Sequence, residues 1–330
     1  MAAIFIHVGY GKCGSTAIQR WLEQNAGELR GEGAFVCGTF LQHCPNAPYR
    51  SVPEMVRAMR DAPDTPDTIH DALAAAATEK SPVIWSVETL QRRYGLMTPI
   101  IRRLKEAGHD VRVVVYLRNH ASWLLSAYAQ WGIKHPTSRR KEAPFIMSFE
   151  EFAEHRSADL DYLSVLANWE ATGATVMPRS YDALDDVVDD FARVVGLTGR
   201  NDGRRANPPL QTSTLALLKG LQSVRRAPAT IGSFERMLRN AKLADAGIAE
   251  ASVDLVALDE AELNALHATF AAQREVLRER YGVDLDETAP RNVLARDNPS
   301  NDDLVAILSL VCFSLHERVE ALEAALAART

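Results

Sequence analysis

The sequence is poor in cysteine, and its four cysteines are not spaced like the ligands of a metal site (Cys13, Cys37, Cys44 and Cys312). We therefore expect free thiols in a reducing compartment and no bound metal. The first residues include neither a basic segment nor a long apolar core, so we expect no signal peptide and a cytoplasmic protein. The longest apolar run near the end, residues 304–315, is too short to cross a bilayer.

A basic excess is also missing from the sequence. The net charge of −6 over 330 residues argues against general nucleic-acid binding, which requires clustered positive charge. No internal repeat or low-complexity tract interrupts the chain. Hydrophobic residues make up 47% of the sequence, which is enough for the core of one large domain or of two.

Short apolar runs alternate with segments in which apolar residues have helical spacing. The runs predict strands at 3–8, 82–87, 111–117 and 174–178. The periodic segments predict helices at 15–26, 96–107, 120–131 and about 183–195. This alternation predicts an α/β fold, in which helices flank a doubly wound parallel sheet.

The remaining segments predict how the chain is divided. We expect an α/β core at 1–200, a helical extension that completes it at 201–300, and an amphipathic helix at 301–330, so that the last third is mainly helical. The proline-rich segment 39–68 predicts irregular structure with one helix. Ligands of such folds bind beyond the carboxyl ends of the strands, so the residues that follow each strand are the candidates for a site.

A glycine-rich loop follows the first predicted strand and precedes a predicted helix. Its sequence is Gly9-Tyr10-Gly11-Lys12-Cys13-Gly14-Ser15-Thr16. Glycines let backbone N–H groups face inward, and the start of the helix adds partial positive charge. Lys12 adds a full charge, and Ser15 and Thr16 add hydroxyl donors. The pattern favours a phosphate-binding loop over a tight turn with an incidental lysine.

The order of residues in this loop differs from that of nucleotide kinases, in which lysine directly follows the last glycine. Here Gly14 is followed by Ser15, and Lys12 stands two positions before Gly14. The order resembles the 5′-phosphosulfate loop of the sulfotransferases that use 3′-phosphoadenosine 5′-phosphosulfate (PAPS), which have a P-loop-like fold, and the continuation is similar to the bacterial branch of that family. The resemblance implies that Lys12 takes part in catalysis and that PAPS is bound by Gly11, Lys12, Cys13, Gly14, Ser15 and Thr16.

A second motif begins where the strand predicted at 111–117 ends. Arg118 follows the strand, and Ser126 comes eight residues later. This spacing resembles the 3′-phosphate segment of the same family, which implies that the Arg118 guanidinium and the Ser126 hydroxyl bind that phosphate. The alternatives are an ion-paired arginine and a serine bonded to its own helical turn. A weaker resemblance extends to residue 197 and to 207–210, and it implies that Asn207 contacts the nucleotide.

The family uses a glutamate or a histidine as the base that accepts the proton of the hydroxyl group. Glu88 directly follows the strand predicted at 82–87, which makes it the first candidate for the catalytic base. The structural alternative is a glutamate that stabilises the start of a helix. His43 and His120 are weaker candidates, and His7 is expected to be a core histidine.

The resemblance implies that the chain transfers a sulfuryl group from PAPS to a hydroxyl of a carbohydrate, glycolipid or small molecule. The leaving group would be 3′-phosphoadenosine 5′-phosphate (PAP), and no metal would be required. A nucleotide kinase or other phosphotransferase and a non-catalytic nucleotide-binding protein remain alternatives.

The position of Cys13 beside Lys12 and the start of a helix predicts a lowered thiol pKa.

Apolar residues at spacings of three and four run along the predicted terminal helix. Such a helix has to bury its apolar face. We expect it either to pack on its own domain or to pair with a second copy of the chain as a homodimer. Its polar face is acidic, which argues against binding to a membrane surface.

Overall fold

The computed structural model describes residues 1–45, 49–135, 147–198 and 260–285, together with positions 308, 312, 315 and 319. Its contacts group into two compact units. Of the described residues, the first unit contains 1–45, 49–119, 159–198 and 269–285. The second contains 120–135, 147–158, 260–268 and the four single positions. The domain boundaries predicted near 200 and 300 lie outside the described residues.

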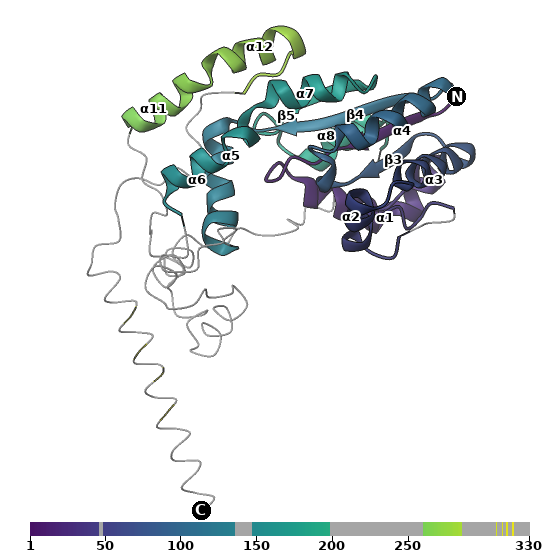
Figure 1. Ribbon diagram of the computed structural model, residues 1–330, viewed down its shortest axis with the longest axis horizontal. Helices are drawn as coiled ribbons and strands as arrows, with labels where there is room; N and C mark the ends of the chain where they lie inside the picture. The colour runs from purple at the N-terminus through teal and green to yellow at the C-terminus, as the bar shows by residue number, and fades with distance from the viewer. Residues whose placement is uncertain are drawn as a thin grey trace, which may run out of the picture. The chain divides into compact units, whose positions relative to one another are not determined.

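A parallel five-stranded sheet in the order β2-β3-β1-β4-β5 forms the centre of the first unit (Figure 1). Its strands are β1 (Ala3–His7), β2 (Phe35–Val36), β3 (Val83–Ser86), β4 (Asp110–Leu117) and β5 (Thr175–Ser180). Every neighbouring pair is parallel. The predicted α/β class with a parallel sheet is therefore confirmed.

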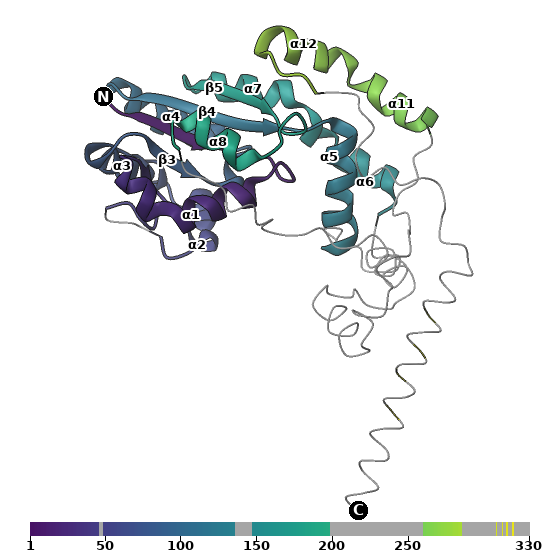
Figure 2. The same cartoon turned by 180° about the vertical axis from the view of Figure 1, so that it is seen from behind.

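Helices that connect the strands flank this sheet. They are α1 (Ser15–Gly31), α2 (Val52–Asp61), α3 (Thr65–Glu79), α4 (Tyr94–Glu106) and α7 (Tyr162–Glu170), with α8 (Val187–Val195) after the last strand. The connection from β1 to β2 runs in one direction along the sheet, and the connection from β3 to β4 runs in the other. Right-handed crossovers therefore place α1 and α4 on opposite faces. In both Figure 1 and Figure 2, α7 lies along β5, with which it is in contact.

The last described helix of the first unit, α12 (Ala271–Tyr281), packs against α7. The side-chain oxygen of Gln273 accepts a hydrogen bond from the Tyr162 N–H at 3.1 Å, and Arg280 pairs with Glu170 at 2.6 Å. These contacts attach a segment far along the sequence to the unit that contains the sheet.

The described helices of the second unit are α5 (His120–Ala127), a π-helix η2 (Tyr128–Lys134), α6 (Phe149–His155) and most of α11 (Glu260–Thr269). A reciprocal pair of hydrogen bonds between Ser148 and Glu151 caps the start of α6. The hydroxyl of Tyr128 donates to the carbonyl of Met147 at 3.0 Å, which ties η2 to the segment before α6.

A buried carboxylate joins α8 to the sheet. Asp190 is 1% exposed, and its carboxylate accepts hydrogen bonds from the Tyr116 hydroxyl at 2.9 Å and from Nε of Arg179 at 3.0 Å. The ring of Phe191 lies 5.4 Å from that of His7, centroid to centroid, so α8 covers the face of β1 from which His7 projects. These contacts hold α8 beside the loop that follows β1.

The predicted elements correspond to observed ones, but α6 and α7 had no predicted counterpart, and three further differences are seen. Strand β2 was not predicted, because two apolar residues carry no periodic signal. The segment 39–68 contains α2 and also the start of α3, so the expectation of one helix was wrong. The helix predicted at 120–131 becomes a π-helix after Ala127.

In the terminal segment, the described positions Leu308, Cys312, Leu315 and Val319 are helical and exposed.

Candidate functional site

The loop after β1 has an unusual backbone at the position of its lysine. Lys12 has φ 70° and Gly14 has φ 80°, both in the left-handed region that non-glycine residues rarely adopt. The N–H of Cys13 donates to the carbonyl of Tyr10 at 3.1 Å, which closes the turn. Gly14 is the N-cap of α1 and has no side chain to bond the first N–H groups of the helix. Such N–H groups are suitable donors for an anion.

Two glycines in this loop allow neighbouring segments to approach closely. A Cβ atom on Gly9 would lie 2.9 Å from Cβ of Ser15 and 3.2 Å from Cα of Glu88. A Cβ atom on Gly14 would lie 2.7 Å from a methyl carbon of Val187 and 3.0 Å from the Tyr181 ring. The loop is therefore packed between the segment after β3 and the segment after β5.

Tyr10 anchors the loop to a distant part of the first unit. Its side chain is buried, and its hydroxyl donates to the carbonyl of Asp159. Its ring meets that of Tyr162 edge to face at 5.2 Å between centroids. Asp159 also pairs with Arg92 at 3.0 Å. These contacts tie the loop to the segment between α6 and α7.

Glu88 begins a short 3₁₀ turn (η1, Glu88–Leu90) directly beyond β3 and beside the loop. Its side chain is half-buried, and burial raises the pKa of its carboxyl above the usual range. The positive charge of Lys12 opposes that shift, which indicates that the two side chains are close enough to interact. A partly desolvated carboxylate beside a lysine has the properties expected of a general base.

Arg118 stands at the end of β4, on the other side of β1 from Glu88. Its Nε atom donates to Oδ1 of Asp182 at 3.1 Å, and its carbonyl accepts a hydrogen bond from the Tyr162 hydroxyl at 2.9 Å. Its guanidinium carbon lies 5.4 Å from the centroid of the Tyr181 ring. Arg118 is therefore ion-paired, and it has a fixed position at the carboxyl edge of the sheet.

The expectation of a lowered Cys13 pKa was wrong. Cys13 is fully buried, and this burial raises the pKa of its thiol, since a thiolate is poorly solvated there. Arg118 and Lys12 act in the opposite direction, but their effect is smaller than that of burial. The thiol of Cys13 fills space beneath the loop.

The other predicted residues lie in several places. Ser15 is buried and donates to the Tyr10 carbonyl at 3.3 Å, whereas Thr16 is exposed. Ser126 lies on α5 in the second unit, and Asn207 lies outside the described residues. Nε2 of His43 lies 3.4 Å from Glu23, in a pair on the surface of the first unit.

His7 is a core histidine, as predicted. It is fully buried, and its Nδ1 atom is 2.7 Å from the Ser86 hydroxyl oxygen. Burial lowers its pKa from 6.5 to about 3. The ring is therefore neutral at physiological pH, which excludes a role as a cation in binding phosphate.

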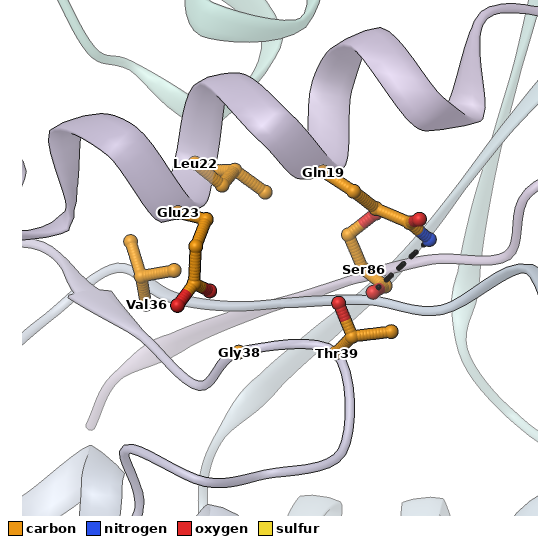
Figure 3. A pocket seen from close by; sticks show the side chains of 7 residues that line it. All are labelled: Gln19, Leu22, Glu23, Val36, Gly38, Thr39 and Ser86. Carbon is orange, nitrogen blue, oxygen red and sulfur yellow. Dashed lines mark hydrogen bonds between the residues drawn. The ribbon is translucent and has the colours of Figure 1, made fainter. Parts of the chain in front are cut away.

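A small pocket opens between α1, the last residues of β2 and β3, and the segment after β2 (Figure 3). Polar groups from both sides line it, and the Gln19 amide donates to the Ser86 carbonyl across it at 3.4 Å. The lining residues are Gln19, Leu22, Glu23, Val36, Gly38, Thr39 and Ser86. Ser86 is two positions before Glu88, so the pocket reaches the same strand end as the candidate base.

Sequence reasoning missed Asp182 and the anchoring role of Tyr10. Asp182 stands four residues after the strand predicted at 174–178 and two after β5, and a position beyond a strand end could have marked it as part of the site. No protein-family model, curated protein or solved structure matches the chain. Within the described ranges, no three His, Cys, Asp or Glu side chains gather as a metal site would require. None of the helices described is both long and apolar enough to span a membrane.

Proposed function

We propose that the chain is a sulfotransferase with a P-loop-like fold, which transfers a sulfuryl group from PAPS to a hydroxyl group. The proposal rests mainly on one observation. The loop that contains Lys12 follows β1, and the neighbouring strands on either side are followed by Glu88 and Arg118. A central cation beside an anion-binding loop, a base on one side and a second cation on the other form the set that this reaction requires.

The topology favours binding of a ligand at this edge. The helix after β1 lies on one face, whereas right-handed connections place α4, between β3 and β4, and α7, between β4 and β5, on the other. Crevices open beyond the carboxyl ends of adjacent strands whose helices leave in opposite directions. The loop after β1 is therefore next to such a crevice on both sides.

In the proposed reaction, Glu88 accepts the proton of the acceptor hydroxyl while the hydroxyl oxygen bonds to sulfur. The bond between sulfur and the bridging phosphate oxygen breaks, and PAP leaves with that electron pair. Lys12 and the N–H groups at the start of α1 stabilise the negative charge on the leaving oxygen. Arg118 binds the 3′-phosphate through charge-assisted hydrogen bonds.

The pocket in Figure 3 supports a hydroxyl-bearing acceptor. Its amide, hydroxyl and carboxylate groups offer hydrogen-bond partners for hydroxyl groups. The pocket has room for little more than a water molecule, so we place at most one hydroxyl group of the acceptor there, where Ser86 connects the pocket to Glu88 along the chain. The carboxylate of Glu23 favours an uncharged or cationic group over an anionic one at this position.

The test is the rate of PAP release from PAPS in the presence of hydroxyl-bearing acceptors. Replacing Glu88 with Gln keeps the shape of the side chain but removes its basicity. We expect turnover to fall about a hundredfold or more, with PAP affinity nearly unchanged. Near-normal turnover of Glu88→Gln would show that Glu88 is not the base. PAP binding without turnover by the wild type would leave a nucleotide-binding protein that is not an enzyme.

A further inference from the structure

Asp182 bonds the arginine of the candidate site with one carboxylate oxygen and the residue after that arginine with the other. Oδ1 accepts a hydrogen bond from Nε of Arg118 at 3.1 Å, and Oδ2 accepts one from the backbone N–H of Asn119 at 2.7 Å. The side chains of Arg118 and Asp182 are 14% and 24% exposed. Because the pair is largely shielded from water, these charge-assisted hydrogen bonds are stronger than those of a surface pair.

The contact with Asp182 leaves one edge of the guanidinium available for a ligand. A guanidinium has five N–H donors, and its two terminal nitrogens form an edge that fits two oxygens of a phosphate. Asp182 uses Nε, and no other described residue accepts a hydrogen bond from the terminal nitrogens. The Tyr162 hydroxyl and the Tyr181 ring restrict the remaining freedom of Arg118.

We propose that Asp182 is a positioning residue that orients Arg118 for two-point binding of a phosphate monoester, and that it thereby makes the site selective for the 3′-phosphate. This inference rests on the proposed function. An unrestrained arginine loses side-chain entropy when it binds a ligand, and Asp182 removes most of that freedom before binding. The negative charge of Asp182 is already compensated by Arg118 and by the N–H of Asn119.

The experiment compares the affinities of PAP and adenosine 5′-phosphosulfate, which lacks the 3′-phosphate, by calorimetry. We expect Asp182→Ala to weaken PAP binding about tenfold and to leave adenosine 5′-phosphosulfate binding unchanged. Asp182→Asn keeps the shape and one acceptor oxygen, so its loss should be smaller. Asp185→Ala removes an exposed carboxylate three residues away and serves as the matched control, with no change for either ligand.

A double-mutant cycle separates positioning from a general effect on the fold. If Asp182 acts through Arg118, Asp182→Ala should cause no further loss of PAP affinity in an Arg118→Ala background. The inference would be overturned if Asp182→Ala still weakened PAP binding about tenfold in the Arg118→Ala background. It would also be overturned if Asp182→Ala alone weakened the binding of PAP and of adenosine 5′-phosphosulfate equally. If the wild type binds PAP but Asp182→Ala and Asp182→Asn bind it equally well, only this inference fails. If the wild type does not bind PAP, the proposed function fails as well.

Discussion

Gly14 provides a sharp test of how the loop is packed. Alanine at this position would retain a φ of 80°, and its Cβ would lie 2.7 Å from a methyl carbon of Val187. The left-handed backbone costs a non-glycine residue about 1–2 kcal/mol. Forcing a methyl group against packed neighbours costs a further 1–3 kcal/mol, roughly. We therefore expect Gly14→Ala to lower the free energy of unfolding by about 2–5 kcal/mol.

Gly196 is the matched control for this substitution. It has φ 77°, and a Cβ atom there would meet nothing within 4 Å. Gly196→Ala should therefore show the backbone cost alone, about 1–2 kcal/mol. The effect of alanine on the entropy of the unfolded chain is common to both variants and cancels in the comparison. Gly27, within α1 and with open space around it, should tolerate alanine with a gain of about 0.5–1 kcal/mol.

The assay is urea unfolding, with free energies from linear extrapolation. The difference between Gly14→Ala and Gly196→Ala isolates the contact of the loop with Val187 and Tyr181. A difference of about 1–3 kcal/mol is expected. If the two variants lose the same stability, the loop is not packed against these residues, and the described site geometry is wrong.

Three further predictions concern titratable side chains. Because burial lowers the pKa of His7 to about 3, the free energy of unfolding should fall as the pH drops from 6.5 toward 3, since the unfolded chain takes up a proton that the folded chain resists. A titration of the His7 ring followed by NMR, with its midpoint near pH 6.5, would contradict this prediction. Burial raises the pKa of Glu88, so its carboxylate should destabilise the fold as the pH rises through the folded-state pKa. Glu88→Gln should remove this loss of stability at higher pH. If the wild type and Glu88→Gln show the same pH dependence of stability, the raised pKa of Glu88 is refuted. Iodoacetamide should label exposed Cys312 faster than buried Cys13, and rapid labelling that survives Cys312→Ser would point to one of the other cysteines.

The sheet was largely predictable, because the strands β1, β3 and β4 are mostly apolar runs that end at or just before a polar residue. Parallel pairing brings the residues after these strands to one edge, so the sequence pattern alone is enough to predict that Lys12, Glu88 and Arg118 share one region. Strand β2 was not predictable from a run of two residues. It is defined by pairing with β3, which is a tertiary contact.

Burial and side-chain partners could not be predicted from local sequence. The position of Cys13 beside Lys12 and a helix start suggested an acidic thiol, but the surrounding core dominates its pKa. Arg118 was predicted as a phosphate ligand, whereas its pairing with Asp182 joins residues separated by 64 positions. Such a contact depends on the order of β4 and β5 in the sheet, which sequence periodicity does not specify.

The most direct test of the central claim is calorimetry with PAP and, separately, with ATP and magnesium. We predict that the chain binds PAP and binds ATP with magnesium far more weakly. Replacing Arg118 with Ala should weaken PAP binding by about 1.5–3 kcal/mol, the contribution of hydrogen bonds to a charged group. Tight binding of ATP with magnesium together with no binding of PAP would contradict the account and favour a phosphotransferase.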